Sequence, residues 1–326
     1  MELFASLKEK IKGKFIPIVF PEGTDERIQG AAIRLNQEGL VKPILLGEPT
    51  KIKQLAADRN LELGDIQIID PNNYDRYETM VDEFVQRRHG KNDHDQAEKM
   101  LRDPNYFGTM FVYLNWADGM VSGATHPTGD TVRPALQIIK AKPGVSRISG
   151  AMIMQRQFDH KRFLFADCAI NIDPDAQTLA EIAVESAQTA QLFDIDPKVA
   201  LLSFSTKGSA KGDVVTKVQE ATKLAQAKAP HIPIDGELQF DAAYVPSVAA
   251  SKAPGSKVAG QANVFIFPEL QSGNIGYKIA QRLGNFEAIG PILQGLNKPV
   301  SDLSRGCNEE DVYKLALITA AQSLNQ

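Results

Sequence analysis

Two segments of this 326-residue chain carry hydroxyl, basic and carboxyl side chains where a strand pattern gives way to a helix pattern. The first, residues 122–136, places Ser122, Thr125 and Arg133 around two glycines. Backbone N–H groups and hydroxyls at the start of a helix favour an anion, and an arginine would add the matching charge. The same residues also suit a glycine-rich connection that binds nothing, so both interpretations stay open.

The second segment, residues 301–312, contains Ser304, Arg305 and Asp311. Asn308 suits the N-cap of a helix, and a carboxylate three residues later completes a capping arrangement, which is the simpler explanation of Asp311. The functional alternative is that Ser304, Arg305 and Asp311 bring an alcohol donor, a guanidinium and a carboxylate to one place.

Other basic positions carry less information on their own. Arg282 follows a helical stretch and could reach across a cleft, whereas Arg87 ends a helix, where the dipole favours a cation in any case. Residues 203–212 follow a strand and resemble a phosphate-cradling loop, but they do not match GxxxxGK[ST]. The chain also has no GxGxxG motif after its first strand, so nucleotide hydrolysis and dinucleotide binding are both disfavoured.

The elements that must position these residues alternate along the chain. Short apolar runs and helical patterns follow one another, which predicts α/β architecture with parallel sheets and helices on both faces, the doubly wound class. We expect strands at 15–20, 43–46, 66–70, 119–121, 151–154, 162–166, 199–203, 264–267 and 288–293. We expect helices at 25–38, 74–88, 175–193, 211–228, 240–250, 275–283 and 308–324, and one that starts with Asp130 or Thr131 as N-cap.

Length and charge limit the kinds of partner. A chain of 326 residues is too long for one ordinary core, so two domains are expected, with a boundary near residues 142–144. The 36 basic and 40 acidic side chains give a net charge of −4, which provides no basic field for nucleic acid or an anionic membrane. An anionic ligand therefore has to be bound by a local arginine cluster.

The cysteines and the N-terminal segment indicate the compartment. Cys168 and Cys307 are far apart and lack CxxC spacing, which suits a reducing compartment and disfavours a disulfide framework or a zinc site. Residues 1–14 alternate like a surface helix rather than a secretory signal, and no run approaches the length of a membrane span. We expect a cytoplasmic protein.

Three motifs together look like those of the phosphate acetyltransferase family. The similarity runs from residue 15 through the final helix and so covers nearly the whole chain; residues 127–129 are Pro-Thr-Gly where the family commonly has Ser-Thr-Ala. The motifs are Ser122-Gly123-Ala124-Thr125-His126 leading into 131–137, Leu201 to Ser209, and Asp302-Leu303-Ser304-Arg305-Gly306-Cys307.

The resemblance implies reversible transfer of an acetyl group between coenzyme A and inorganic phosphate, so the partners would be acetyl-CoA or CoA and phosphate or acetyl phosphate. It implies no cofactor and no metal ion in the active site. It also implies a homodimer and two α/β domains with an interdomain cleft, similar to the isocitrate and isopropylmalate dehydrogenases. The last helix would return to the first domain, giving domain one at 1–144 plus 300–326 and domain two at 145–299. The residues that match the family's positions are Ser304, Arg305 and Asp311 at the reaction centre, and Arg282, Arg133, Arg87, Thr125 and Ser122 for substrate.

Direct displacement needs a base for the CoA thiol and a donor for the carbonyl oxygen. Asp311 would be the base and Ser304 the donor, while Arg305 would stabilise the thiolate and the phosphate. A free aspartate near pKa ~3.9 and a thiol near ~8.5 are poorly matched, by roughly 6 kcal/mol. Either burial must raise the pKa of Asp311, or arginines must stabilise the thiolate.

Three alternatives remain to be distinguished from acetyl transfer. A phosphate butyryltransferase would differ only in the volume of its acyl pocket, which the sequence does not reveal. An isocitrate-dehydrogenase-type oxidoreductase would need a carboxylate cluster for a divalent metal and a nicotinamide site, and neither is evident. A non-catalytic regulatory domain, like the one appended to some malic enzymes, is disfavoured because Ser304, Arg305 and Asp311 are all present.

Overall fold

The computed structural model describes residues 3–324. They form two compact α/β units, which we call unit 1 (Met1–Pro143 with Leu296–Gln326) and unit 2 (Gly144–Gly295). The last helix thus belongs with the N-terminal part of the chain. No helix in the described range is both long enough and apolar enough to cross a membrane.

Unit 1 is built on a five-stranded sheet in the order β11-β4-β1-β2-β3, and every pair in it is parallel. β1 lies at the centre, and four of its five residues are buried because helices cover both faces of the sheet. The strands are β1 (Ile16–Phe20), β2 (Val41–Leu46), β3 (Gln67–Ile69), β4 (Gly119–Ser122) and β11 (Val300–Asp302).

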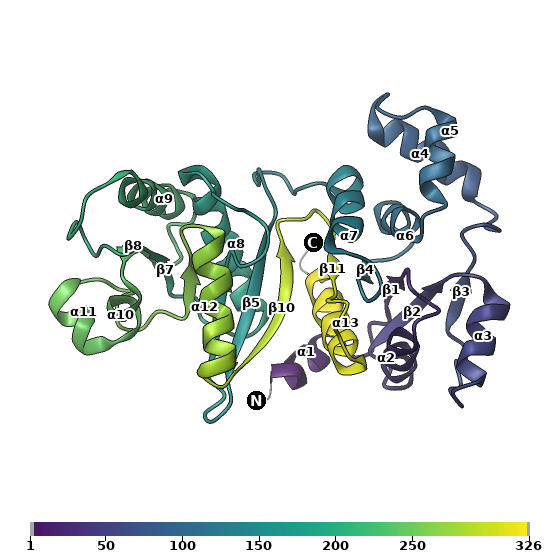
Figure 1. Ribbon diagram of the computed structural model, residues 1–326, viewed down its shortest axis with the longest axis horizontal. Coiled ribbons are helices and arrows are strands. Elements are labelled where there is room, and N and C mark those ends of the chain that lie inside the picture. Colours follow the sequence, from purple (N-terminus) through teal and green to yellow (C-terminus); the bar gives the residue numbers. More distant parts are fainter. Residues whose placement is uncertain (1–2, 325–326) are drawn as a thin grey trace. The chain divides into compact units, whose positions relative to one another are not determined.

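The helices of unit 1 cover the two faces of this sheet. α13 packs against α1, α2, β4 and β1, and α6 packs against β1 and β4 from the opposite side (Figure 1). A π-helical turn, Ala135–Ile139, follows α7 directly. The helices are α1 (Leu3–Ile11), α2 (Glu26–Gln37), α3 (Pro49–Ala57), α4 (Tyr77–Arg88), α5 (His94–Leu101), α6 (Pro104–Tyr113), α7 (Thr128–Pro134) and α13 (Glu309–Ser323).

Unit 2 has a six-stranded sheet in the order β10-β5-β6-β9-β7-β8. The wholly parallel sheet expected from the sequence is wrong at one edge, since β10-β5 and β5-β6 are antiparallel. Residues 157–161 join β5 to β6, and so short a connection can make a hairpin but not a crossover. The strands are β5 (Ser149–Arg156), β6 (Arg162–Ala166), β7 (Val199–Leu202), β8 (Ile234–Leu238), β9 (Val264–Ile266) and β10 (Phe286–Gln294).

The helices of unit 2 lie on both faces of its sheet, with α12 in front of it and α8 behind in Figure 1. The single helix expected over 240–250 is in fact two helices, because Pro246 forces Val245 into an extended conformation. The helices are α8 (Ala176–Leu192), α9 (Asp213–Lys228), α10 (Phe240–Tyr244), α11 (Pro246–Lys252) and α12 (Leu270–Leu283).

The helix after β4 begins earlier than the sequence indicated. Asp130 and Thr131 were expected at its N-cap, but α7 starts at Thr128 and Pro127 occupies the cap position. Proline presets the backbone angle before a helix, and no side chain caps this end. Asp130 therefore lies in the first turn, where its charge suits the helix dipole.

Candidate active site

Three neighbouring strands of unit 1, β11, β4 and β1, end at one edge of the sheet, which we call the carboxyl edge. They run parallel, so the loops that leave their ends begin side by side. Glu22 follows β1, Thr125 follows β4, and Ser304 and Arg305 follow β11. The two segments singled out from the sequence therefore converge here, and the loop after β1 joins them.

The carboxylate of Glu22 occupies the loop that was expected to face a bound anion. It accepts hydrogen bonds from the backbone N–H groups of residues 123–125 at 2.6 to 3.0 Å, and from the Thr125 hydroxyl at 2.8 Å. The Nδ1 atom of His126 lies 2.8 Å from the same carboxylate. Only 5% of Glu22 is exposed. The anion that these N–H groups bind is thus a side chain of the chain itself.

The two predicted hydroxyl groups of this loop differ in exposure. Ser122 is fully buried, and its hydroxyl donates to the Oδ1 atom of Asn105 at 2.6 Å. Thr125 is exposed, although its hydroxyl is bound to Glu22. Both hydroxyls therefore help to fix the loop after β4.

Asp302, the last residue of β11, is a second buried carboxyl at this edge and is 3% exposed. Burial raises its pKa, the nearby Glu22 carboxylate adds to the rise, and the hydroxyls of Thr128 and Thr131 offset part of it. Its Oδ1 atom makes no hydrogen bond with any described residue. A Cβ atom at Gly123 would lie 2.7 Å from this oxygen, so only glycine fits beside it.

The loop after β11 exposes the side chains of Ser304 and Arg305. The N–H of Gly306 donates to Ser304 Oγ at 3.2 Å, and the N–H of Cys307 donates to the Ser304 carbonyl at 2.9 Å, which makes a local turn. The Arg305 guanidinium forms no hydrogen bond or ion pair within residues 3–324. It is therefore an unpaired cation at the carboxyl edge.

Asp311 has the capping geometry that the sequence suggested as the simpler explanation. Its Oδ2 atom accepts from the N–H of Asn308 at 3.0 Å, and its own N–H donates to Asn308 Oδ1 at 2.9 Å. The pair forms a capping box at the start of α13. Asp311 is exposed, and within the described residues its Oδ1 atom makes no hydrogen bond.

Arg27, which the sequence analysis missed, connects all three loops. Its guanidinium donates to both carboxylate oxygens of Asp25 at 3.0 and 2.8 Å, and to the carbonyl of Ala124 at 2.8 Å. It also donates to the carbonyls of Arg305 and Cys307 at 2.9 and 3.0 Å. The segment 22–27 follows a buried strand and opens a helix, which is the pattern that drew attention to the other two loops.

The remaining predicted arginines lie in different places. Arg133 is exposed near the end of α7 and has no hydrogen bond or ion pair with the described part of the chain. Arg87 is half-buried; it donates to the carbonyls of Ile138 and Ile139 at 2.6 and 3.2 Å, so it caps the π-helical turn. Arg282 is exposed in the last turn of α12, in unit 2.

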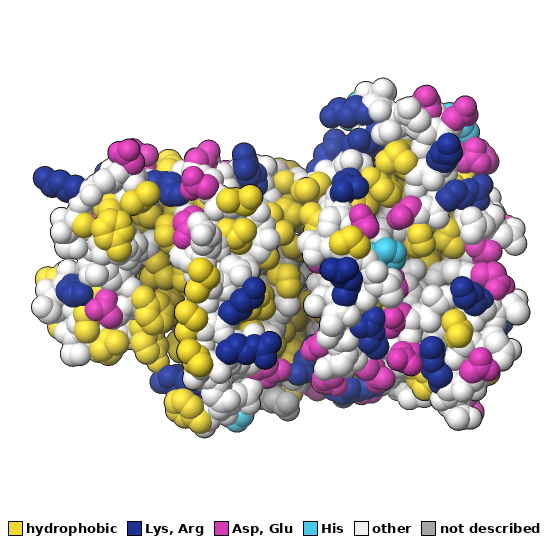
Figure 2. Space-filling model, in the orientation of Figure 1, with side chains coloured by type: hydrophobic (Ala, Val, Ile, Leu, Met, Phe, Trp, Pro, Cys, Tyr) yellow, Lys and Arg dark blue, Asp and Glu magenta, His cyan; other side chains and the backbone are white. Residues whose placement is uncertain are grey.

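Positive charge gathers near α4 and α7 (Figure 2). Burial lowers the pKa of Lys140, and Arg87, Lys91 and Arg88 lower it further, so these four cations are close to one another. Burial raises the pKa of Tyr106, and the nearby charges of Arg133 and Arg88 offset part of that rise. A local basic cluster therefore exists on unit 1 despite the negative net charge of the chain.

The loop at 203–212 in unit 2 is also occupied by an internal carboxylate. Glu237 is buried and accepts from the Ser205 hydroxyl at 2.9 Å and from the N–H of Gly208 at 2.7 Å. Burial opposes ionisation, but these hydrogen bonds outweigh it and lower the pKa of Glu237. As at Glu22, a loop that resembles a phosphate cradle binds a side chain of the protein.

Both cysteines are free and buried, and burial raises the pKa of the Cys168 and Cys307 thiols. Neither is therefore suited to act as a thiolate nucleophile. Within residues 3–324, no group of three or more His, Cys, Asp or Glu side chains is arranged to hold a metal ion.

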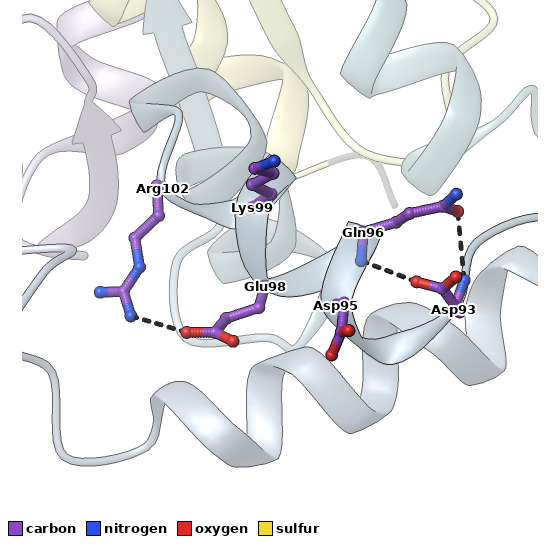
Figure 3. A pocket seen from close by; sticks show the side chains of 6 residues that line it. All are labelled: Asp93, Asp95, Gln96, Glu98, Lys99 and Arg102. Carbon is purple, nitrogen blue, oxygen red and sulfur yellow. Dashed lines mark hydrogen bonds and ion pairs between the residues drawn. The ribbon is translucent and has the colours of Figure 1, made fainter.

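A surface pocket on α5 is a poor candidate for a second site. Figure 3 shows that its charged side chains are largely satisfied by one another: Arg102 donates to Glu98 at 3.2 Å, and Asp93 and Gln96 form a capping box. The residues that line it are Asp93, Asp95, Gln96, Glu98, Lys99 and Arg102.

Comparison with known proteins supplies the family. A sequence model of the family described as phosphate acetyl/butaryl transferase matches residues 2–320. The phosphate acetyltransferase of Bacillus subtilis is 61% identical over 323 residues, which is 99% of each chain. The crystal structure of a phosphotransacetylase from Streptococcus pyogenes is 62% identical, with a TM-score of 0.98 over 99% of this chain and 98% of that one.

A more distant structure shares the fold alone. A putative 4-hydroxythreonine-4-phosphate dehydrogenase from Salmonella typhimurium is 12% identical, with a TM-score of 0.54 over 94% of this chain and 99% of that one. The expected two-domain, dehydrogenase-like α/β class is therefore confirmed. Full-length identity near 60% and the family match carry the remaining conclusion: the chain belongs to the phosphate acetyl/butaryl transferase family and is an acyltransferase.

Proposed function

We propose that this enzyme transfers an acetyl group reversibly between coenzyme A and inorganic phosphate. The full-length similarity to proteins named phosphate acetyltransferase supports the reaction. We place the reaction at the carboxyl edge because the exposed, unpaired guanidinium of Arg305 lies there, next in sequence to the exposed Ser304. A cation and a hydroxyl donor at the carboxyl edge suit a reaction in which thiolate, phosphate and a carbonyl oxygen all carry negative charge.

In the direction that forms acetyl-CoA, the CoA thiol gives its proton to Asp311 and the thiolate attacks the acetyl carbonyl of acetyl phosphate. Ser304 donates to the carbonyl oxygen as charge develops there. The tetrahedral intermediate collapses, the bond to the phosphate oxygen breaks, and inorganic phosphate leaves beside Arg305. The reverse reaction retraces these steps with phosphate as the nucleophile.

The exposure of Asp311 bears on how an aspartate could deprotonate a thiol of much higher pKa. Because Asp311 is exposed, the route through burial is not the one we adopt. We assign the larger part to Arg305, which lowers the pKa of the CoA thiol by stabilising its thiolate. The Oδ1 atom of Asp311 is available to take the proton, since Oδ2 caps α13.

We propose that arginine side chains bind the phosphates of coenzyme A. We propose that Arg133 binds substrate directly and that Arg282 is also a substrate-binding residue. Arg87 contributes positive charge and supports the π-helical turn, because its Nε and Nη2 atoms bind carbonyl groups there. We assign Thr125 and Ser122 to the support of the adjoining loop, with the exposed Thr125 alone bordering the substrate.

We further propose a cytoplasmic homodimer that needs no resident cofactor or metal ion and binds neither nucleic acid nor membrane. The net charge of −4 supports the last point. If a metal were required, dialysis against a chelator would abolish activity; we expect activity to be unchanged.

A thiol-release assay tests the reaction. Acetyl-CoA should release CoA only when phosphate is present, and butyryl-CoA should react more slowly. Release without phosphate would indicate a thioesterase, and faster release from butyryl-CoA would select the butyryltransferase.

Replacement of Arg305 tests where the reaction occurs. Arg305→Ala should lower turnover by about 10²-fold or more and weaken phosphate binding. Arg305→Lys should recover only part of the loss, because the guanidinium fork is gone. Full recovery with lysine would reduce Arg305 to a point charge.

A further inference from the structure

The guanidinium of Arg27 uses all of its hydrogen-bonding capacity within the protein. Five N–H groups are available on arginine, and the five bonds to Asp25, Ala124, Arg305 and Cys307 account for each of them. The carboxylate of Asp25 also balances its charge. Arg27 therefore has neither a free donor nor an uncompensated charge with which to bind substrate.

The bonds to the loop after β11 are important because that loop has little other support. Two local bonds hold residues 304–307 together, from Gly306 N–H and Cys307 N–H to Ser304. Within residues 3–324, the bonds from Arg27 are the only hydrogen bonds that reach residues 304–307 from elsewhere in the chain. They hold the backbone on both sides of Gly306, which is exposed and open around its Cα atom.

The same guanidinium ties this loop to the one after β4. Nη1 binds the two carbonyls at 305 and 307, while Nη2 binds the carbonyl of Ala124, next to Thr125. A guanidinium is planar and rigid, so these three carbonyls are held at a fixed spacing. Asp25 fixes the guanidinium in turn, and its own carboxylate caps α2 through the N–H of residue 27.

We propose that Arg27 is a positioning residue for acyl transfer, which fixes the backbone of the Ser304–Arg305 loop so that both side chains are presented to the reacting atoms. It acts through Ser304 and Arg305 and does not touch substrate. A misplacement of about 1 Å in a catalytic group can reduce turnover by about 10²-fold. This inference rests on the proposed function, because it assigns the reaction to Ser304 and Arg305.

Two variants of Arg27 test the proposal. Arg27→Gln should lower kcat by about 10-fold to 100-fold while the KM values for CoA and acetyl phosphate change by less than about threefold. Arg27→Lys keeps the charge and a bond to Asp25 but offers three donors instead of five, so it should fold and recover only part of kcat.

Arg34→Gln is the matched control. Arg34 also lies on α2 and also reaches a distant segment, through an ion pair with Glu310 at 2.5 Å, but it contacts none of the three loops. Its loss should lower the thermal midpoint without changing kcat. If Arg27→Gln and Arg27→Lys change kcat no more than Arg34→Gln does, Arg27 is merely structural and the proposal is overturned.

A double-mutant cycle separates this inference from the function on which it rests. Because Arg27 acts in part through Arg305, Arg27→Gln should lower kcat by a smaller factor in an Arg305→Ala background than in the wild type. Independent, multiplicative losses would overturn the positioning role and leave the proposed function intact. An Arg305→Ala enzyme with wild-type kcat would instead overturn the function proposed for the loop.

Discussion

In each unit, one carboxylate of the protein binds a loop that was expected to bind a ligand. Glu22 binds the N–H groups of residues 123–125, and Glu237 binds the loop that begins at Ser203 in unit 2. Sequence patterns identify loops rich in N–H groups and hydroxyls, but they do not reveal which partner satisfies those groups. Here the partners are remote in sequence, and we propose that arginines bind the substrate anions instead.

Asp311 should combine a structural and a chemical role. Asp311→Asn preserves an oxygen for the N–H of Asn308, so α13 should remain capped and the thermal midpoint should change little. An amide cannot accept the thiol proton, and kcat should therefore fall by about 10²-fold or more, with the KM for CoA largely unchanged. Steady-state kinetics and thermal melts measure the two effects. A wild-type kcat would leave Asp311 with the capping role alone.

Asp302 should make unit 1 less stable as its carboxyl ionises. Its pKa is raised in the folded state, so the folded chain keeps a proton that the unfolded chain releases above about 3.8. The contribution of Asp302 to the free energy of unfolding is therefore fully present below pH 3.8. It is lost as the pH rises through the raised pKa. Asp302→Asn removes the charge, and at neutral pH it should raise the free energy of unfolding.

Thermal melts between about pH 4 and pH 8 test the sign of this linkage. The advantage of Asp302→Asn should shrink as the pH falls. Asp82→Asn, at an exposed position on α4, removes the same charge and should give no such trend. A variant that is less stable than wild type at neutral pH would show that the ionised carboxylate is favourable where it lies.

Among the elements, long periodic helices and strands rich in apolar residues were predictable, and strands with few apolar residues were not. The sequence located α13, which runs from Glu309 to Ser323, within one residue at each end, because a cap and a continuous helical pattern define it. It missed β11 and β8, since Val-Ser-Asp and Ile-Asp-Gly-Glu-Leu carry too few apolar residues to indicate a buried strand. β11 is a strand because β4 pairs with it. The end of β11 places Ser304 and Arg305 next to the loop after β4, so the missed strand determines where these residues lie.

The sequence predicted the loops of the site but not all of the residues that hold them together. The two loops with unusual side chains were found, and they do meet at one edge of a sheet. Glu22 and Arg27 were missed because their roles depend on contacts with residues about 100 and 280 positions away, which are visible only in the fold. The arginines of α4 and α7 were found as charges, but the bonds of Arg87 to the π-helical turn were not.

The loop between β4 and α7 should depend on the charge of Glu22. In Glu22→Gln the amide nitrogen must face backbone N–H donors, so at least one buried donor loses its acceptor. We expect the free energy of unfolding to fall by about 1.5 to 3 kcal/mol, the range for hydrogen bonds to a charged group. Glu26→Gln is the control, because Glu26 makes an exposed ion pair with Arg59 at 3.2 Å and no further ion pair with residues 3–324. Urea denaturation that affects both variants equally would contradict this role.

At the scale of the whole molecule, unit 2 bears an apolar stripe that nothing in the described chain of that unit covers. Ile275, Ile279 and Leu283 are 55%, 53% and 85% exposed at successive turns of α12. The spacing of four residues places them on one helix face. Exposed apolar side chains in a row mark an interaction surface more often than scattered ones do, which supports the proposed homodimer.

Ile279→Asp should therefore weaken self-association. A charge at the middle of a buried apolar stripe loses roughly 2 to 3 kcal/mol of burial, which is about 100-fold in the dissociation constant. Val214→Asp is the matched control, because Val214 is 56% exposed on α9 and the apolar residue one turn later, Val218, is buried. Analytical ultracentrifugation should find the wild type and Val214→Asp as dimers and Ile279→Asp shifted toward monomer. A monomeric wild type would overturn the homodimer, and an unaltered Ile279→Asp dimer would place its interface away from α12.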